Sequence, residues 1–313
     1  MKSYIIKRLL ATIPVLVLIA VITFAILHLA PGDPASVLLG DQGTAEEVEA
    51  LRKKMQLDRP IYVQFGTWFA QVVQGDLGKS VFSGQPVLHA LAERLEPTLA
   101  LASLSAMLAI LIAIPLGVMA AWRANTWIDR GAMILSVLGW SIPAFWLGIN
   151  LIFLFGLKLR ILPVMGYMPL KEGMVPFLKH LIMPVVTLGL VNAALIARMT
   201  RASMLEILQE DYIRTARAKG LTERLVLIRH ALRNAAIAII TIVGLSFAAL
   251  VAGVVVTETV FAIPGVGRLV VDAVLRRDYP IIQGAILMVG STYVFINLAV
   301  DLLYTYFDPR VKY

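Results

Sequence analysis

Long apolar runs with almost no charge alternate with short charged segments along most of the chain. A helix needs about 20 mainly apolar residues to cross the hydrocarbon of a bilayer. Six runs reach or approach that length: Leu9–Leu29, Thr98–Trp122, Gly131–Leu157, Leu181–Ala197, Asn234–Thr257 and Ile281–Val300. The pattern predicts an all-α polytopic membrane protein with six transmembrane helices.

Composition supports a bilayer as the solvent. The chain has 313 residues, of which 59% are hydrophobic and 15% charged, whereas soluble domains average about 25% charged residues. Lys2, Lys7 and Arg8 precede the first run, as basic residues precede a signal peptide. That run is longer than the 7–15 residues usual for a signal peptide and lacks an Ala-x-Ala cleavage site, so we expect a retained membrane anchor.

The distribution of Lys and Arg predicts the orientation. An even number of spans puts both termini on one side, and the loops of that side carry 15 Lys and Arg, against seven in the short loops opposite. Because basic loops stay in the cytoplasm, we expect both termini to be cytoplasmic. The net charge of +8 is then mostly a product of topology and not a sign of nucleic-acid binding.

The same reading divides the chain into three parts. Residues 1–30 form a cytoplasmic N-terminus and first span, residues 31–97 an extracytoplasmic helical segment, and residues 98–313 a five-span core with a cytoplasmic loop at 198–233. In the outer segment, Thr44 and Glu47 have the spacing of a capping box at a helix start. A second helix ending at Gly75 and a short third one over Val87–Leu95 are also expected.

Several chemistries find no support. The chain has no cysteine, and its four histidines lack the spacing of metal ligands. The stretch "VQGDLGKS" at 73–80 resembles a phosphate-binding loop, but Val73 replaces the required first glycine and the predicted topology puts it outside the cell. We therefore expect no metal, nucleotide or other cofactor in this chain.

The loop at 198–233 is the most polar part of the core, with eight basic and four acidic residues. Helical spacing continues from the fourth span through Tyr212, Gly220 suits a helix end, and Thr222 suits the N-cap of a second helix over Glu223–Asn234. The sequence predicts a protruding elbow of two helices. It could be a solvated loop or lie on anionic lipid, but interleaved charges and the small residues Ala216, Ala218 and Gly220 favour a protein partner.

The elbow sequence "DYIRTARAKGL…RHALRNA" resembles the coupling loop of ATP-binding-cassette importer permeases of the dipeptide, oligopeptide and nickel branch. The general pattern of importer permeases as a whole is Glu-Ala-Ala, three residues, Gly, nine residues and Ile-x-Leu-Pro, of which this chain keeps only Ala216, Gly220 and Leu232. The departing stretches "RTARAKG" and "HALRNA" are similar to the dipeptide, oligopeptide and nickel branch. Further stretches are similar to that branch: "PGDPA", "LDRPIYVQF", "GDLGKS", "MTRASMLEILQEDY", "TETVFAIPGVGRLVVDAVLRRDYPIIQG" and "VDLLYTYFDPRV".

The resemblance implies a non-catalytic permease subunit of an ATP-driven peptide importer in the bacterial or archaeal inner membrane. It further implies a second related permease, two ATP-binding subunits that use ATP and Mg, and an extracytoplasmic substrate-binding protein. The residues implied to contact the ATPase are Arg214, Thr215, Ala216, Arg217, Ala218, Lys219, Gly220 and Leu221. Dipeptides, oligopeptides, glutathione and nickel chelates all remain open as substrates.

Polar residues in or near the spans are candidates for the substrate path: Asn150, Asn192, Asn297 and Glu258. These residues could instead have a purely structural role. The asparagines would then form hydrogen bonds between helices, and Glu258 would pair with a nearby polar or charged group. Gly265 and Gly267, in a turn near the outer face, are candidates for contact with the binding protein. A competing function is a stand-alone transporter driven by an ion gradient, which would be expected to show inverted repeats and acids at mid-span; the sequence shows neither.

Overall fold

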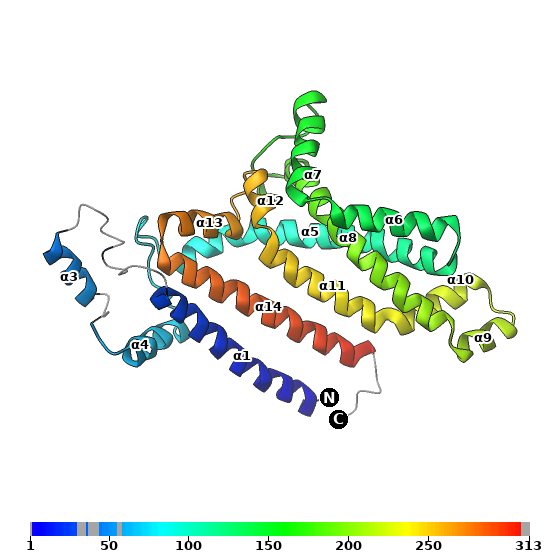
Figure 1. Ribbon diagram of the computed structural model, residues 1–313, viewed down its shortest axis with the longest axis horizontal. Helices are drawn as coiled ribbons and strands as arrows, with labels where there is room; N and C mark the ends of the chain where they lie inside the picture. Colours follow the sequence, from blue (N-terminus) through cyan, green and yellow to red (C-terminus); the bar gives the residue numbers. More distant parts are fainter. Residues whose placement is uncertain (1, 30–35, 37–43, 55–57, 308–313) are drawn as a thin grey trace.

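The structure is a computed structural model that describes residues 2–29, 36, 44–54 and 58–307 (Figure 1). Within those ranges the chain is helical apart from connecting turns, and its β structure is an isolated antiparallel bridge between Lys79 and Pro86. The all-α fold class is confirmed. The "PGDPA" motif at 31–35, Arg310 and Lys312 lie outside the described residues.

Five single helices are long and apolar enough to cross a membrane, and they coincide with five of the six predicted runs. The first and last are α1 (Lys2–Leu29) and α14 (Tyr279–Phe307). Between them come α5 (Val87–Trp122), α8 (Met174–Leu208) and the span at Glu223–Val251. This last span joins α10 (Glu223–Leu225), π-helical η4 (Val226–Leu232) and α11 (Arg233–Gly253).

The remaining run, Gly131–Leu157, is not one straight helix. It comprises α6 (Trp127–Ser141) and then α7 (Ala144–Leu151) with π-helical η2 (Ile152–Lys158), and the two parts meet at 93°. The bend falls at Pro143, which cannot donate a backbone hydrogen bond and disfavours helical torsions at the residue before it. Counted as one bent span, the pair makes the sixth, and α7 stands away from the bundle in Figure 1.

The described part of the segment at 31–97 contains the predicted helices. The helix α3 (Ala45–Lys54) begins with the expected capping box: Glu47 Oε2 accepts the Thr44 N–H at 2.9 Å, and Thr44 Oγ1 accepts the Glu47 N–H at 3.3 Å. The helix α4 (Ile61–Val73) contacts α1 through rings, with Phe24 5.4 Å from Phe65 between centroids. The third predicted helix is not separate, because α5 already begins at Val87.

Small residues let α5 and α8 approach closely along much of their length. A methyl group added at Gly117 of α5 would lie 2.7 Å from both the Ala197 carbonyl oxygen and Thr200 Cβ of α8. Ala109 and Ala113 of α5 are fully buried in the same contact. Close approach of this kind is how membrane helices gain packing energy without a hydrophobic driving force.

The two ends of the bundle differ. At one end, α8 and α11 are joined by α9 (Asp211–Ala218) and its following turn. At the other end lie short elements: η3 (Leu170–Glu172), α12 (Val255–Val260) and α13 (Val266–Arg276), together with the start of α5. Candidate sites therefore fall into an elbow at one end and a group of short elements at the opposite end.

Candidate coupling elbow and outer cluster

The predicted elbow geometry is confirmed. The helix α9 ends at Ala218, and Gly220 follows with φ of +79°, in the left-handed region where a glycine has no steric penalty. The Gly220 N–H donates to the Arg217 carbonyl at 2.9 Å, and α10 starts after Thr222. Thr222 occupies the N-cap position, but its side chain makes no capping hydrogen bond.

A hydrophobic cluster holds the elbow to the bundle from inside. Met204 of α8, Ile213 of α9, and Val226 and Ala231 of η4 are fully buried in it. Ala216 also belongs to this cluster and is only 7% exposed. Its small side chain therefore packs inward, and its contact with an ATPase stays a prediction.

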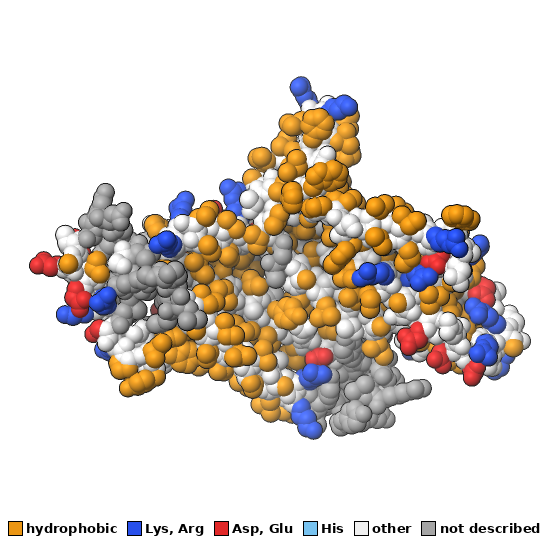
Figure 2. All heavy atoms as spheres, in the orientation of Figure 1, with side chains coloured by type: hydrophobic (Ala, Val, Ile, Leu, Met, Phe, Trp, Pro, Cys, Tyr) orange, Lys and Arg blue, Asp and Glu red, His pale blue; other side chains and the backbone are white. Residues whose placement is uncertain are grey.

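The other candidate coupling residues face outward or lie at the edge of the cluster. Arg214, Thr215, Arg217, Ala218, Lys219 and Gly220 are exposed, and Leu221 is half-buried. Charges of both signs gather over this end of the molecule (Figure 2). Arg217 pairs with Glu223 across the corner at 2.8 Å, and a methyl group added at Gly220 would meet nothing within 4 Å. The corner is braced within this chain and open toward a partner.

An ion pair with a buried carboxylate ties α8, the helix that leads into the elbow, to α6. Arg201 of α8 donates to both carboxylate oxygens of Asp129 at 2.5 and 2.7 Å, and the Asn125 N–H adds a third hydrogen bond at 2.9 Å. Asp129 is 3% exposed. Because a buried charge is costly without partners, this arrangement fixes the position of α6 against α8. Sequence reasoning missed it, although a lone acid at the start of an apolar run was a signal.

The three candidate asparagines each donate to a carbonyl of their own helix. Asn150 bonds to Trp146 at 2.7 Å, Asn192 to Leu188 at 2.9 Å, and Asn297 to Tyr293 at 3.0 Å. They lie on α7, α8 and α14, and their described hydrogen bonds do not join them to one another or to Glu258. Their place in a substrate path stays a prediction.

Glu258 is the centre of a polar cluster at the end of the bundle opposite the elbow. It is fully buried and accepts hydrogen bonds from the Thr98 hydroxyl at 2.6 Å and the Arg268 N–H at 2.9 Å. Thr98 in turn accepts the Val266 N–H at 2.9 Å. Burial raises the pKa of the Glu258 carboxyl, and its hydrogen bonds oppose that rise. The cluster fastens the start of α13 to α5 and α12.

Gly265 and Gly267 lie against this carboxylate. A methyl group at Gly267 would come within 2.7 Å of Val255 Cα and 3.0 Å of Glu258 Oε2, and one at Gly265 would collide with the carboxylate. Both glycines are buried. The structure gives them an internal packing role, and their contact with a binding protein stays a prediction.

The comparisons with known proteins identify the family. Residues 113–313 match the family described as "Binding-protein-dependent transport system inner membrane component", and residues 1–102 match its N-terminal companion family. The chain belongs to this family. It is thus a multi-pass permease of the inner membrane, the component of an ATP-driven importer that leaves ATP hydrolysis to separate partner subunits.

Relatives of this permease match over its whole length. A protein of Sinorhizobium fredii named "Probable peptide ABC transporter permease protein y4tP" is 48% identical over 313 residues, with both chains fully covered. The "Dipeptide transport system permease protein DppB" of Alkalihalophilus pseudofirmus is 40% identical over 333 residues, again with both chains covered. The "Glutathione transport system permease protein GsiC" of Escherichia coli O6:H1 is 44% identical over 313 residues, also with full coverage of both.

A solved structure supports the fold of the permease. The inward-facing MetNI methionine ABC transporter aligns with a TM-score of 0.58 at 19% identity, covering 71% of this chain and 97% of that chain. At that identity the likeness concerns the fold alone.

Proposed function

We propose that this permease lines, together with a second related permease, the path of an importer that carries peptides into the cell. The observation that carries the proposal is the full-length match to relatives named for peptides and dipeptides, at 48% and 40% identity. A relative named for glutathione matches as closely, at 44%. Glutathione is itself a tripeptide, so a short peptide is the shared chemistry; nickel chelates are a further alternative.

The geometry of the elbow supports the proposed contact with an ATP-binding subunit. Its exposed residues Arg214, Thr215 and Arg217 to Gly220 form a compact convex corner that is braced by the Arg217–Glu223 pair. Such a corner fits a groove on an ATP-binding subunit, where ATP and Mg would be bound. Closure of two such subunits would then move α8 and α11, which flank the elbow.

The same proposal sets the orientation. The elbow and both termini lie in the cytoplasm, in accord with the excess of basic residues in their loops. The segment at 31–97 and the α12–α13 region then lie outside, where a substrate-binding protein would dock. The first turn of α1 and the last turn of α14 also lie at the same end of the molecule in Figure 1, as an even number of spans requires.

The test is to co-express the chain with the permease and ATPases encoded beside it and purify the complex in lipid nanodiscs. We expect ATPase subunits to co-purify and hydrolysis to rise when a binding protein loaded with dipeptide is added. The complex is also reconstituted into liposomes with the ATPase subunits facing inward and the binding protein outside. Labelled dipeptide should then be taken up only when ATP is enclosed in the liposomes. Uptake driven by an ion gradient without ATP would overturn the proposal, and uptake of glutathione but not dipeptide would change its substrate.

A further inference from the structure

The turn between α5 and α6 carries two arginines that are stacked on tryptophans. The guanidinium carbon of Arg123 lies 4.4 Å from the centre of the Trp122 ring, and that of Arg130 lies 5.4 Å from the centre of the Trp127 ring. All four side chains are exposed, and Trp127 is 83% exposed. The elbow, the candidate substrate path and the motifs described above leave these four residues without a role.

Hydrogen bonds hold the turn in one conformation. The Arg130 N–H donates to the Thr126 carbonyl at 3.0 Å, and the Asn125 N–H donates to Asp129 at 2.9 Å. The same carboxylate binds Arg201 of α8 at 2.7 Å. The stacked arginines are therefore presented from a short, braced turn that is tied to a third helix.

The turn lies where the membrane-spanning surface ends. The second apolar run stops at Trp122, and α6 begins at Trp127 with large apolar side chains exposed along its length: Ile134, Leu135, Leu138 and Trp140. Both helices contribute to membrane spans, and Figure 1 places their turn at the elbow end of the bundle. Because tryptophan is enriched where hydrocarbon meets headgroups, the turn falls at the headgroup level and continues directly into a lipid-facing surface.

The charges around the turn leave a positive excess. Asp129 is the one acid between residues 122 and 131, and it is buried and paired with Arg201. The two arginines of the turn form no ion pair among the described residues. The neighbouring helix α8 contributes two further charges of opposite sign over residues 190–208: Arg198 and Glu206. Two positive charges on the stacked arginines therefore remain without a counterion in this chain.

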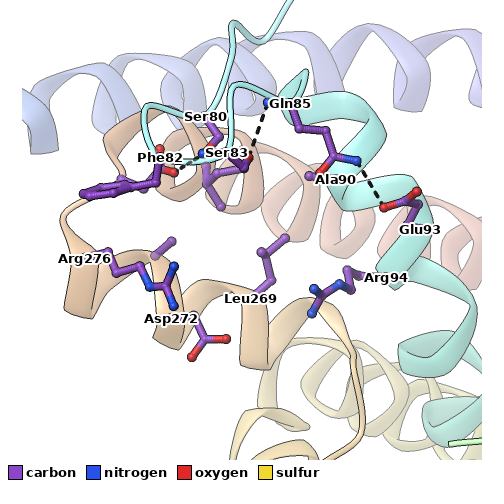
Figure 3. A pocket seen from close by; sticks show the side chains of 13 residues that line it. Ser80, Phe82, Ser83, Gln85, Ala90, Glu93, Arg94, Leu269, Asp272 and Arg276 are labelled. Carbon is purple, nitrogen blue, oxygen red and sulfur yellow. Dashed lines mark hydrogen bonds between the residues drawn. The ribbon is translucent and has the colours of Figure 1, made fainter.

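The opposite end of the bundle has no such excess. A cavity of about 310 Å³ opens there (Figure 3). Its lining includes two arginines and three acids: Arg94, Arg276, Glu93, Asp272 and Asp278. The charges of that cavity are offset within it, so the two ends of the permease differ in what they offer to an anion.

An arginine stacked on an aromatic ring keeps the N–H groups along its edge available, and paired hydrogen bonds to phosphate are a preferred use of those groups. Basic residues beside a membrane span also attract anionic lipids. We propose that the α5–α6 turn binds the headgroup phosphate of an anionic phospholipid in the leaflet at the elbow end, with Arg123 and Arg130 as its ligands. The inference requires only that the chain spans a bilayer, so it goes beyond the proposed function and does not depend on it.

A phospholipid matches the whole of this surface. Its phosphate meets the arginines, and its acyl chains lie along the exposed apolar side chains of α6. An ATP-binding subunit, which lies in water, would reach the turn but not the apolar surface that continues from it. The two excess positive charges favour a headgroup with net negative charge, because the ammonium of a zwitterionic headgroup cancels the charge of its phosphate.

The test is native mass spectrometry of the purified complex in detergent, titrated with phosphatidylglycerol or with phosphatidylcholine of the same acyl chains. Arg123→Gln and Arg130→Gln each remove one charge, whereas Trp127→Leu removes the ring beneath Arg130 and keeps the charge. The matched control is Lys158→Gln, which removes a charge from an exposed residue at the far end of the same bent span. Unchanged binding of phosphatidylcholine and unchanged co-purification of the other subunits establish that a variant is folded.

We expect the unchanged complex to bind phosphatidylglycerol more tightly than phosphatidylcholine. Each Arg substitution should raise the Kd for phosphatidylglycerol about fivefold, the effect of one basic residue at an anionic membrane surface. Trp127→Leu should raise it about two- to fivefold, because the ring no longer holds the guanidinium. Lys158→Gln should change it less than about twofold, since a charge that far from the turn is screened.

Three results would overturn the lipid site. One is an equal Kd for the two lipids in the unchanged complex. Another is a loss of affinity in Lys158→Gln as large as in the Arg variants, since that would report net charge and not this turn. The third is release of the ATPase subunits by the Arg substitutions with an unchanged Kd for phosphatidylglycerol, which would make the turn a contact with another subunit. All three leave the proposed import of peptides standing, because uptake is measured separately.

Discussion

Arg201 holds both carboxylate oxygens of Asp129 at 2.5 and 2.7 Å, and so joins α8 to the start of the bent third span. Arg201 lies on the helix that runs into the elbow, whereas Asp129 lies on α6. Movement of the elbow by an ATPase would therefore be passed to α6 through a charged contact as well as through packing.

Asp129→Ala should be strongly destabilising because it leaves the Arg201 guanidinium without its partner. We expect a loss of about 3 kcal/mol, at the lower end of the range for broken buried pairs, since Arg201 is partly exposed. The measurement is the melting temperature of the purified complex. Arg198→Ala, which removes an exposed charge one turn earlier on α8, is the control and should melt near the unchanged complex. Equal melting of both variants would show that the pair contributes little.

Gly220→Val should impair coupling through the backbone alone. The φ of +79° is strained for a β-branched residue by about 1 kcal/mol or more, while no neighbour within 4 Å would clash with the added side chain. We expect ATP hydrolysis to lose its response to the loaded binding protein. Gly220→Asn is the control, because asparagine tolerates left-handed torsions better than other non-glycine residues. A Val variant that still responds fully would argue against a required torsion at this corner.

Gly117→Ala should loosen the contact between α5 and α8. The added methyl would press on the backbone of Ala197, which cannot move aside as a side chain can, so we expect a cost of about 1–3 kcal/mol. Gly131→Ala is the matched control: it also adds a methyl to a helix, but into open space. Its effect should be neutral or slightly stabilising because alanine favours helix more than glycine. Thermal melting of the two variants side by side decides the matter.

Glu258 should make the stability of the permease fall as pH rises. Burial raises its folded-state pKa above the ordinary value of 4.5, so the folded chain keeps a proton that the unfolded chain has lost. The stabilising contribution is complete below the unfolded pKa and is lost as pH rises through the folded one. Melting temperatures measured from about pH 4 to about pH 8 should decline, and the decline should be smaller in Glu258→Gln. Identical slopes would assign the pH dependence to other groups.

The membrane helices could be predicted from the sequence because each long apolar run requires the bilayer as its solvent. The segments that separate the runs carry charged residues, which mark where each run ends. It did not predict the direction that a run takes after a bend. Gly131–Leu157 is apolar throughout, so hydropathy alone makes it one span; Pro143 was the only local sign of the 93° turn. In the same way, Val87–Leu95 and the following run share a helical pattern, and the structure joins them in one continuous helix.

The candidate site was predicted unevenly for a similar reason. The torsion at a helix end and the capping of a helix start depend on residues close together in the sequence. Gly220 and the capping box at Thr44 could therefore be found from spacing. Partners distant in sequence could not, and the contact between Thr98 and Glu258 joins residues 160 positions apart. The burial of Ala216 depends on which face of α9 the neighbouring helices cover, and a short amphipathic segment does not reveal that face.

The elbow has two faces that answer to different requirements. Its inward residues, such as Ile213 and Val226, are fixed by contacts within this chain, so changes there must be matched by changes in α8 and η4. Its outward residues, from Arg217 to Gly220, are constrained in the described part of the chain mainly by the Arg217–Glu223 ion pair and by the backbone torsion at Gly220. Under the proposed docking of an ATP-binding subunit, the outward face can therefore vary together with that subunit, and transplanting it onto a different permease would transfer the choice of ATPase without changes to the membrane helices.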